Sequence, residues 1–119
     1  MSPKAKDELA ADHLLVAREA LDNERPGDAL NALFYGSEAA IVALADANGI
    51  GTKKNHHLKA SAAAELHQKG VLKTDFGPLL RQLNQGRKDY WYEGDDPHID
   101  LENAYDEVSH LVTAAQEDK

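Results

Sequence analysis

Apolar residues recur along this chain with the period of an α-helix. A stripe at that spacing runs through residues 5–23 and consists of Ala10, Leu14, Ala17 and Leu21. Residues 29–48 are apolar around most of a helix circumference, as expected for a helix that is contacted on several sides. No segment of the sequence shows the alternation typical of a strand. The pattern therefore predicts an all-α protein with the helix of residues 29–48 at its centre.

Turn and capping residues set the limits of this second helix. Residues 25–28 form a predicted turn, in which Asp28 caps the helix that follows. Residues 48–51 end the helix, because Gly49 can adopt the positive φ of a C-terminal cap.

Two further helices are predicted in the next part of the chain. The third begins near His56 and ends at Gly70. Thr74 or Asp75 caps the fourth helix, which ends at residues 94–97. The face of the fourth helix that points toward the core carries Phe76, Leu79, Leu80, Leu83, Arg87, Tyr90 and Trp91.

A fifth helix follows Asp100, its predicted cap. Its apolar stripe is the most regular in the chain and consists of Leu101, Ala104, Tyr105, Val108, Leu111, Val112 and Ala115. Together the segments predict an antiparallel bundle of four to five helices. A chain of 119 residues that is 42% hydrophobic fits one domain, residues 1–119, with a core over about residues 5–117.

The amino-acid composition restricts the cellular compartment in which we expect the protein. The chain has no cysteine, so disulfides and thiolate-bound zinc are excluded, and a cytoplasmic location is expected. The longest apolar run, within residues 37–45, is too short to cross a bilayer, and the start of the chain lacks the apolar segment of a secretory signal. We therefore expect no membrane association.

The net charge of −8 opposes nonspecific binding to long nucleic acids. Positive charge is concentrated in the middle of the sequence, at Lys53, Lys54, His56, His57, Arg81, Arg87 and Lys88. A polyanionic ligand would therefore bind this middle part.

Arg87 is the most informative single position. It lies four residues after Leu83 and four before Trp91, so its guanidinium shares a face with core residues. A buried arginine is costly unless it is paired, and Glu38 occupies a similarly apolar face of the second helix. A Glu38–Arg87 pair would satisfy both groups, either as a structural ion pair or as part of a functional site.

Three aromatic residues, Tyr90, Trp91 and Tyr92, follow Arg87 and Lys88. Aromatic and cationic groups in such a cluster stack single-stranded bases or anchor a protein interface. The alternative is that Tyr90 and Trp91 complete the core stripe. We expect this of one of them, and we expect Tyr92 to be exposed.

The six histidines raise the question of a metal site. His56 and His67 share a helix face but are about 16 Å apart along the helix axis at 1.5 Å per residue, too far to bind one ion. The sequence also lacks a glycine-rich phosphate loop and a nucleophile elbow. We therefore predict no metal site and no cofactor.

Short motifs occur in order along residues 8–116: Asp28-Ala29-Leu30, Phe34-Tyr35, Ala39-Ala40, Lys54-Asn55-His56, Lys69-Gly70-Val71-Leu72 and Leu83-Asn84-Gln85-Gly86-Arg87-Lys88-Asp89-Tyr90. In this order they resemble the HEPN superfamily, in particular the small prokaryotic HEPN proteins encoded beside a minimal nucleotidyltransferase.

The resemblance implies a dimeric bundle and a metal-independent ribonuclease site, in which four to six residues separate an arginine from a following histidine. If Arg87 is that arginine, the positions expected to hold the histidine are Tyr92, Glu93 and Gly94. The first later histidine is His98, beyond a predicted helix break. Without the imidazole, general acid–base catalysis loses its usual proton carrier, so we expect ribonuclease activity to be reduced or absent.

Other groups could take the place of the missing histidine. His98 or His56 could reach the site from a loop or a helix end, or a tyrosine could be the relevant group. In some of these family pairs the nucleotidyltransferase modifies a tyrosine of the HEPN partner near the motif. That role would make Tyr90 or Tyr92 a substrate.

Two function hypotheses follow. The first is a homodimeric HEPN-like protein that binds RNA or a nucleotide within a toxin–antitoxin or defence pair, with a nucleotidyltransferase-type antitoxin. The alternative is a noncatalytic dimeric protein-interaction module. The candidate catalytic residues are Arg87, Tyr92 and His98. The candidate ligand-binding residues are Glu38, His56, Lys88, Asp89, Tyr90 and Trp91.

Overall fold

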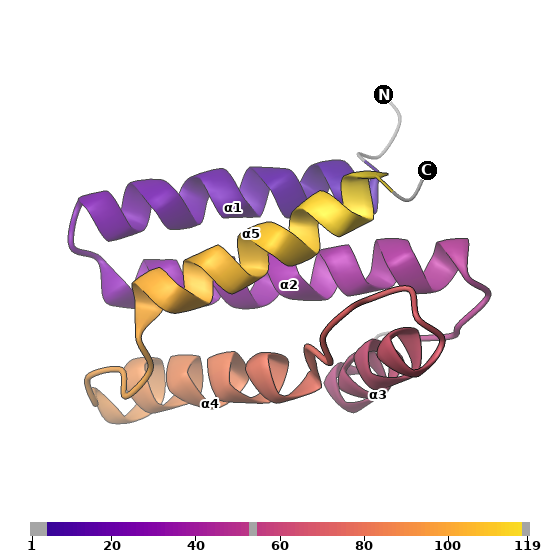
Figure 1. Cartoon of the computed structure of the whole chain (residues 1–119). Coiled ribbons are helices and arrows are strands. Elements are labelled where there is room, and N and C mark those ends of the chain that lie inside the picture. The colour runs from indigo at the N-terminus through magenta and orange to yellow at the C-terminus, as the bar shows by residue number, and fades with distance from the viewer. Residues whose placement is uncertain (1–4, 53–54, 118–119) are drawn as a thin grey trace.

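The chain folds into a bundle of α-helices (Figure 1). Its structure is a computed structural model that describes residues 5–52 and 55–117. These residues form five helices and no strand: α1 (Lys6–Asp22), α2 (Pro26–Ala47), α3 (His56–Gln68), α4 (Gly77–Glu93) and α5 (Leu101–Glu117). The all-α prediction is therefore confirmed.

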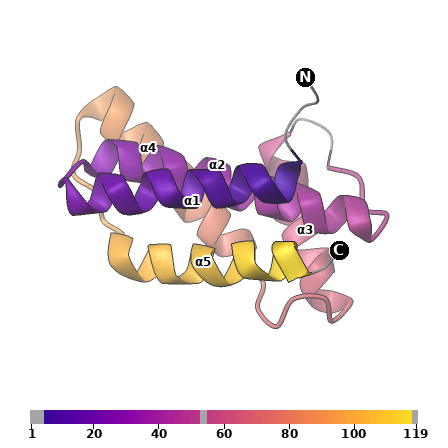
Figure 2. The ribbon, with the colours of Figure 1, turned by 90° about the horizontal axis from the view of Figure 1, so that it is seen from above.

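Helix α2 is the centre of the bundle and contacts each of the other four helices. Helix α1 lies antiparallel beside α2, and α3 and α4 lie along the edge of α2 opposite α1 (Figure 1). Helix α5 covers the face of α2 seen in Figure 1, and Figure 2 shows from above that it lies to one side of α1 and α2. The apolar circumference of α2 explains this position, because nearly every side of the helix is buried. Its largest buried side chains are Leu30, Leu33, Phe34, Ile41 and Leu44. Within the described residues, none of the helices combines the length and apolarity needed to cross a membrane.

The predicted helix limits are correct except at the start of α2. Asp28 was expected to cap this helix, but the helix already begins at Pro26, and Asp28 lies in its first turn. Proline is favoured at the first helical position, where its fixed φ suits the helix and its missing N–H is no loss. The carboxylate of Asp28 still lies near the positive end of the helix dipole.

The other predicted caps are confirmed in part. The residue at the cap position of α4 is Phe76, which makes no side-chain cap bond, and not Thr74 or Asp75, although the Asp75 carboxylate accepts a hydrogen bond from the Gly77 amide at 2.8 Å. The Asp100 carboxylate accepts one from the Asn103 amide at 3.1 Å, at the start of α5. Gly94 ends α4 in the left-handed region, with φ of 71°.

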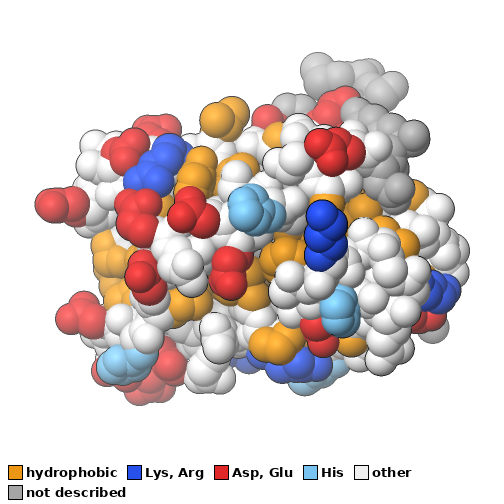
Figure 3. Space-filling model, viewed as in Figure 1, with side chains coloured by type: hydrophobic (Ala, Val, Ile, Leu, Met, Phe, Trp, Pro, Cys, Tyr) orange, Lys and Arg blue, Asp and Glu red, His pale blue; other side chains and the backbone are white. Residues whose placement is uncertain are grey.

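Acidic side chains gather over the neighbouring ends of α1 and α5 on the face shown in Figure 3. Arg18 of α1 lies among them and pairs with Glu102 at 2.8 Å and with Asp22 at 2.9 Å. This face of the bundle suits a phosphate-bearing ligand poorly, because its charge repels phosphate.

Candidate functional site

The guanidinium of Arg87 lies against two aromatic rings of α2. Its Cζ is 4.9 Å from the centre of the Phe34 ring and 5.5 Å from that of the Tyr35 ring. Arg87 Nη2 donates a hydrogen bond to Asn84 Oδ1 at 2.9 Å, whereas its Nε is buried without a hydrogen-bond partner among the described residues. The charge is thus held by aromatic faces and one neutral amide.

The predicted Glu38–Arg87 pair is wrong. The Glu38 side chain is only 6% exposed and is engaged by α3, through a hydrogen bond with His56 Nδ1 and an ion pair with Lys59 Nζ at 3.4 Å. His56 and Lys59 are three residues apart and therefore share one face of α3, which packs against α2. Among the described residues, no carboxylate pairs with Arg87.

Phe34 contacts both His56, which binds Glu38, and Arg87. Its ring centre is 5.2 Å from that of His56, while the Arg87 guanidinium lies against the same ring. The Glu38 carboxylate orients the imidazole of His56 by binding its Nδ1 atom. Of the predicted site residues, the structure therefore brings together Glu38, His56 and Arg87.

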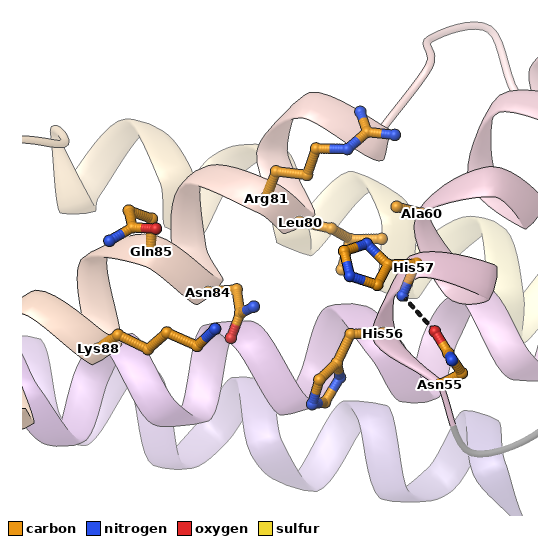
Figure 4. Close-up of a pocket in the computed structure, with 9 residues that line it drawn as sticks. All are labelled: Asn55, His56, His57, Ala60, Leu80, Arg81, Asn84, Gln85 and Lys88. Atoms are coloured by element: carbon orange, nitrogen blue, oxygen red, sulfur yellow. Dashed lines mark hydrogen bonds between the residues drawn. The ribbon is translucent and has the colours of Figure 1, made fainter.

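A cavity of about 470 Å³ lies beside these residues, between α3 and α4 (Figure 4). We call it the α3–α4 cavity. Its lining residues are Asn55, His56, His57, Ala60, Leu80, Arg81, Asn84, Gln85 and Lys88. In Figure 4 the two histidines stand on the α3 side, and Lys88 extends toward Asn84 from the α4 side. Lys53 and Lys54, also expected to add positive charge, lie outside the described residues.

The aromatic cluster at the end of α4 is anchored on α2. Tyr90 and Trp91 contact each other edge to face, with ring centres 5.3 Å apart, and Trp91 Nε1 donates to the Gly27 carbonyl at 3.2 Å. Tyr90 is partly buried and packs against the core, whereas Trp91 is 50% exposed and Tyr92 is 75% exposed. The expectations that one of the first two completes the core and that Tyr92 is exposed are therefore confirmed.

His98 and Asp89 lie in a different place. Both line a second cavity, of about 310 Å³, on the side of α4 that carries Gln82, Gln85 and Gly86. Asp89 also accepts a hydrogen bond from Gln85 Nε2 at 2.8 Å. These α4 residues share a face that differs from that of Arg87, so His98 is not brought to the guanidinium.

Metal ligands are not grouped in the described part of the chain. No cluster of three or more His, Cys, Asp or Glu side chains there is arranged to hold a metal ion.

Three residues that contact Arg87 or Glu38 were not predicted from the sequence. Asn84 and Lys59 bind Arg87 and Glu38 respectively, and Tyr35 lies against the guanidinium. Asn84 had a local signal, because it precedes Arg87 by three residues and so lies one helical turn away. Lys59 and Tyr35 had none, because their contacts depend on how separate helices pack.

The chain was also compared with known proteins. No protein-family model, no curated protein and no solved structure gave a match to it.

Proposed function

We propose that this protein binds RNA or a nucleotide through Arg87 and the neighbouring side chains, as an HEPN-like protein. The observation that carries the proposal is the state of Arg87: a half-buried guanidinium held by Asn84 and two rings, without a carboxylate among the described residues. A cation removed from water is costly unless an anion compensates it. A phosphate group would supply that anion through charge-assisted hydrogen bonds.

Exposed aromatic rings near Arg87 suit the bases of such a ligand. Trp91 follows Arg87 by one helical turn and is half exposed, and Tyr35 is 41% exposed beside the guanidinium. Bases stack on aromatic side chains with little sequence preference. Single-stranded RNA or a free nucleotide therefore fits this region better than a duplex, whose bases are already stacked.

Binding without efficient cleavage is the activity we propose. Tyr92 stands at the first position where the family motif has histidine, and His98 lies in the second cavity. His56 shares the neighbour Phe34 with the guanidinium, but its Nδ1 atom is engaged by Glu38. General acid–base catalysis in this arrangement lacks the usual pairing of arginine and histidine on one helix.

A nucleotidyltransferase-type antitoxin is the partner that this proposal implies. Of the two tyrosines that such an enzyme could modify, Tyr92 is 75% exposed, whereas Tyr90 packs against the core. Tyr92 is therefore the acceptor we propose. Mass spectrometry of the protein purified from its native host would test this, since a nucleotide adduct should map to Tyr92 and not to Tyr90.

A second candidate function, the noncatalytic dimeric interaction module, is supported by a different observation. Trp91 and Tyr92 are large, neighbouring and well exposed side chains. Exposed aromatic residues beside an arginine are typical of the centre of a protein interface.

One experiment separates the two functions. Replacing Arg87 by alanine should weaken the affinity for short single-stranded RNA at least about tenfold, the loss expected for one charge-assisted contact. Arg18→Ala is the matched control, because it removes the same charge on the acidic face of α1 and α5. If Arg87→Ala leaves RNA and nucleotide affinity unchanged but dissociates a dimer in sedimentation, the interaction module is correct and the first proposal is wrong.

A further inference from the structure

We propose that the α3–α4 cavity binds a nucleoside phosphomonoester, either as a free mononucleotide or as the phosphorylated end of an RNA strand. This inference rests on the proposed function and names the part of the ligand that the cavity recognises. It differs from the role of Arg87, which does not line the cavity.

The charge of the cavity wall is the first argument. Its nine lining residues include Arg81, Lys88, His56 and His57 but no aspartate or glutamate. In the whole chain, acidic residues outnumber lysine and arginine by 21 to 13. The cavity wall has two permanent cations and no acidic residue, so its local charge is opposite in sign to the net charge of the protein. This favours the binding of an anion.

The acidic group that contacts the lining residue His56 is already compensated. Glu38 reaches His56 from α2, but its side chain is 6% exposed and both of its carboxylate oxygens are engaged, one by His56 and one by Lys59. It therefore presents little negative charge to a ligand in the cavity. Lys59 in turn is occupied by Glu38, which leaves Lys88 and Arg81 as the cations that face the ligand.

A phosphomonoester suits these cations better than a phosphodiester within a strand. It carries about −1.5 to −2 charges at neutral pH and offers three acceptor oxygens. Two cations can compensate such a group, and charge-assisted hydrogen bonds to it are the strong ones.

The size and the remaining lining groups argue for a nucleoside beside the phosphate. A volume of about 470 Å³ lies within the range of cavities that bind small molecules. Asn55, Asn84 and Gln85 add side-chain amides, which both donate and accept hydrogen bonds and so match base edges and sugar hydroxyls. Ala60 and Leu80 add an apolar surface.

The cavity is connected to Arg87 through two residues of α4. Asn84 lines the cavity and accepts the hydrogen bond from Arg87 Nη2, and Lys88 is the next residue after Arg87. A strand whose phosphorylated end occupies the cavity would therefore continue past the guanidinium toward Trp91. A free mononucleotide would occupy the cavity alone.

Calorimetric titration of the full chain tests the proposal with matched ligands. The ligands are AMP, adenosine, and one short single-stranded RNA carrying a phosphate at its 5′ end, at its 3′ end or at neither. We expect AMP to bind at least about tenfold more tightly than adenosine, which corresponds to one strong charge-assisted contact. A similar gain for either phosphorylated RNA would identify a strand end as a source, and a gain for AMP alone would identify a free nucleotide.

Two variants locate the effect. Lys88→Gln should remove most of the preference for the phosphorylated ligand, because it deletes the exposed cation that extends over the cavity. Lys69→Gln makes the same chemical change on an exposed residue at the end of α3, outside the cavity, and should leave the preference intact. Equal losses in both variants would overturn the assignment to this cavity.

The failures of the two proposals are distinguishable. If RNA binds in an Arg87-dependent way but neither AMP nor a phosphorylated RNA end binds more tightly than its unphosphorylated counterpart, the inference about the cavity is wrong and the proposed function stands. If no RNA or nucleotide binds at all, both are wrong.

Discussion

The buried carboxylate of Glu38 is held by His56 in a hydrogen bond that joins the middle of α2 to the first turn of α3. Lys59 pairs with the other carboxylate oxygen at 3.4 Å. One acidic side chain of the central helix thus fixes the position of the helix that forms one wall of the α3–α4 cavity.

Glu38→Gln should lower the free energy of unfolding by about 1–3 kcal/mol, because Lys59 and His56 lose their charged acceptor. The loss stays in this range since His56 is about half exposed and can be hydrated. Urea unfolding followed by circular dichroism measures it. Glu65→Gln is the control: its pair with Lys69 is exposed and should contribute less than about 1 kcal/mol. Equal effects of the two substitutions would contradict the structural role of Glu38.

Gly27→Ala should disturb the anchor of the aromatic cluster. A Cβ atom at this position would lie 2.2 Å from Tyr90 Cε1 and 2.8 Å from Trp91 Cζ2, so both rings must move. We expect a destabilisation of about 1–3 kcal/mol, the usual cost of overpacking. Trp91 is the single tryptophan of the chain, so its fluorescence emission reports the displacement directly.

Gly51→Ala is the matched control for that substitution, because an added Cβ there meets no atom within 4 Å. Its tryptophan emission should equal that of the unsubstituted protein. An unchanged emission in Gly27→Ala as well would show that the rings do not pack on this glycine.

Acid should destabilise the protein in part through His13. Burial lowers the pKa of His13 from its ordinary value of 6.5, and the nearby Asp12 carboxylate opposes this shift only partly. The unfolded chain therefore binds the proton more readily than the folded protein. This contribution is absent above the ordinary pKa, and stability falls as the pH decreases through that value toward the lower folded pKa.

Thermal unfolding from about pH 7.5 to about pH 5.5 measures this effect, since the unperturbed histidine titrates within that range. His13→Gln should show a smaller decrease in melting temperature over the same interval. Parallel curves for the two proteins would rule out His13 as the titrating group.

Short single-stranded RNA should remain intact when incubated with the purified protein. The reason is that His98 follows the end of α4 and lines the second cavity, away from the face of α4 that carries Arg87, and that Tyr92 stands where the proposed family motif would have histidine. Gel electrophoresis of end-labelled RNA checks this. Cleavage that persists in the presence of a chelator and disappears in His56→Ala would instead assign turnover to the imidazole that Glu38 orients.

The helices were predictable from the sequence because their signals are local. Apolar periodicity and the caps Asp100 and Gly94 each act within a turn or two of the backbone. The start of α2 was missed because two valid signals compete there, Pro26 as a first helical residue and Asp28 as a cap.

The partners of the buried charges were not predictable in the same way. Periodicity placed Glu38 and Arg87 on inward faces, and both are at least partly buried. Which groups meet them depends on the packing of α3 and α4 against α2. Glu38 is 18 residues from His56 and 21 from Lys59, so no local rule connects them. The α3–α4 cavity likewise exists only after these helices pack.

The Phe34 ring affects how His56 and Arg87 are positioned for a ligand. Its ring touches the imidazole of His56 on one side of the region and supports the guanidinium of Arg87 on the other. Phe34 is 1% exposed and belongs to the most deeply enclosed helix, so the ring has little freedom to reorient. The distance between the His56 imidazole and the Arg87 guanidinium is therefore set by the rigid Phe34 ring and not by the loops that join the helices. A ligand that engages both would meet them already in place and would lose little binding energy to ordering them.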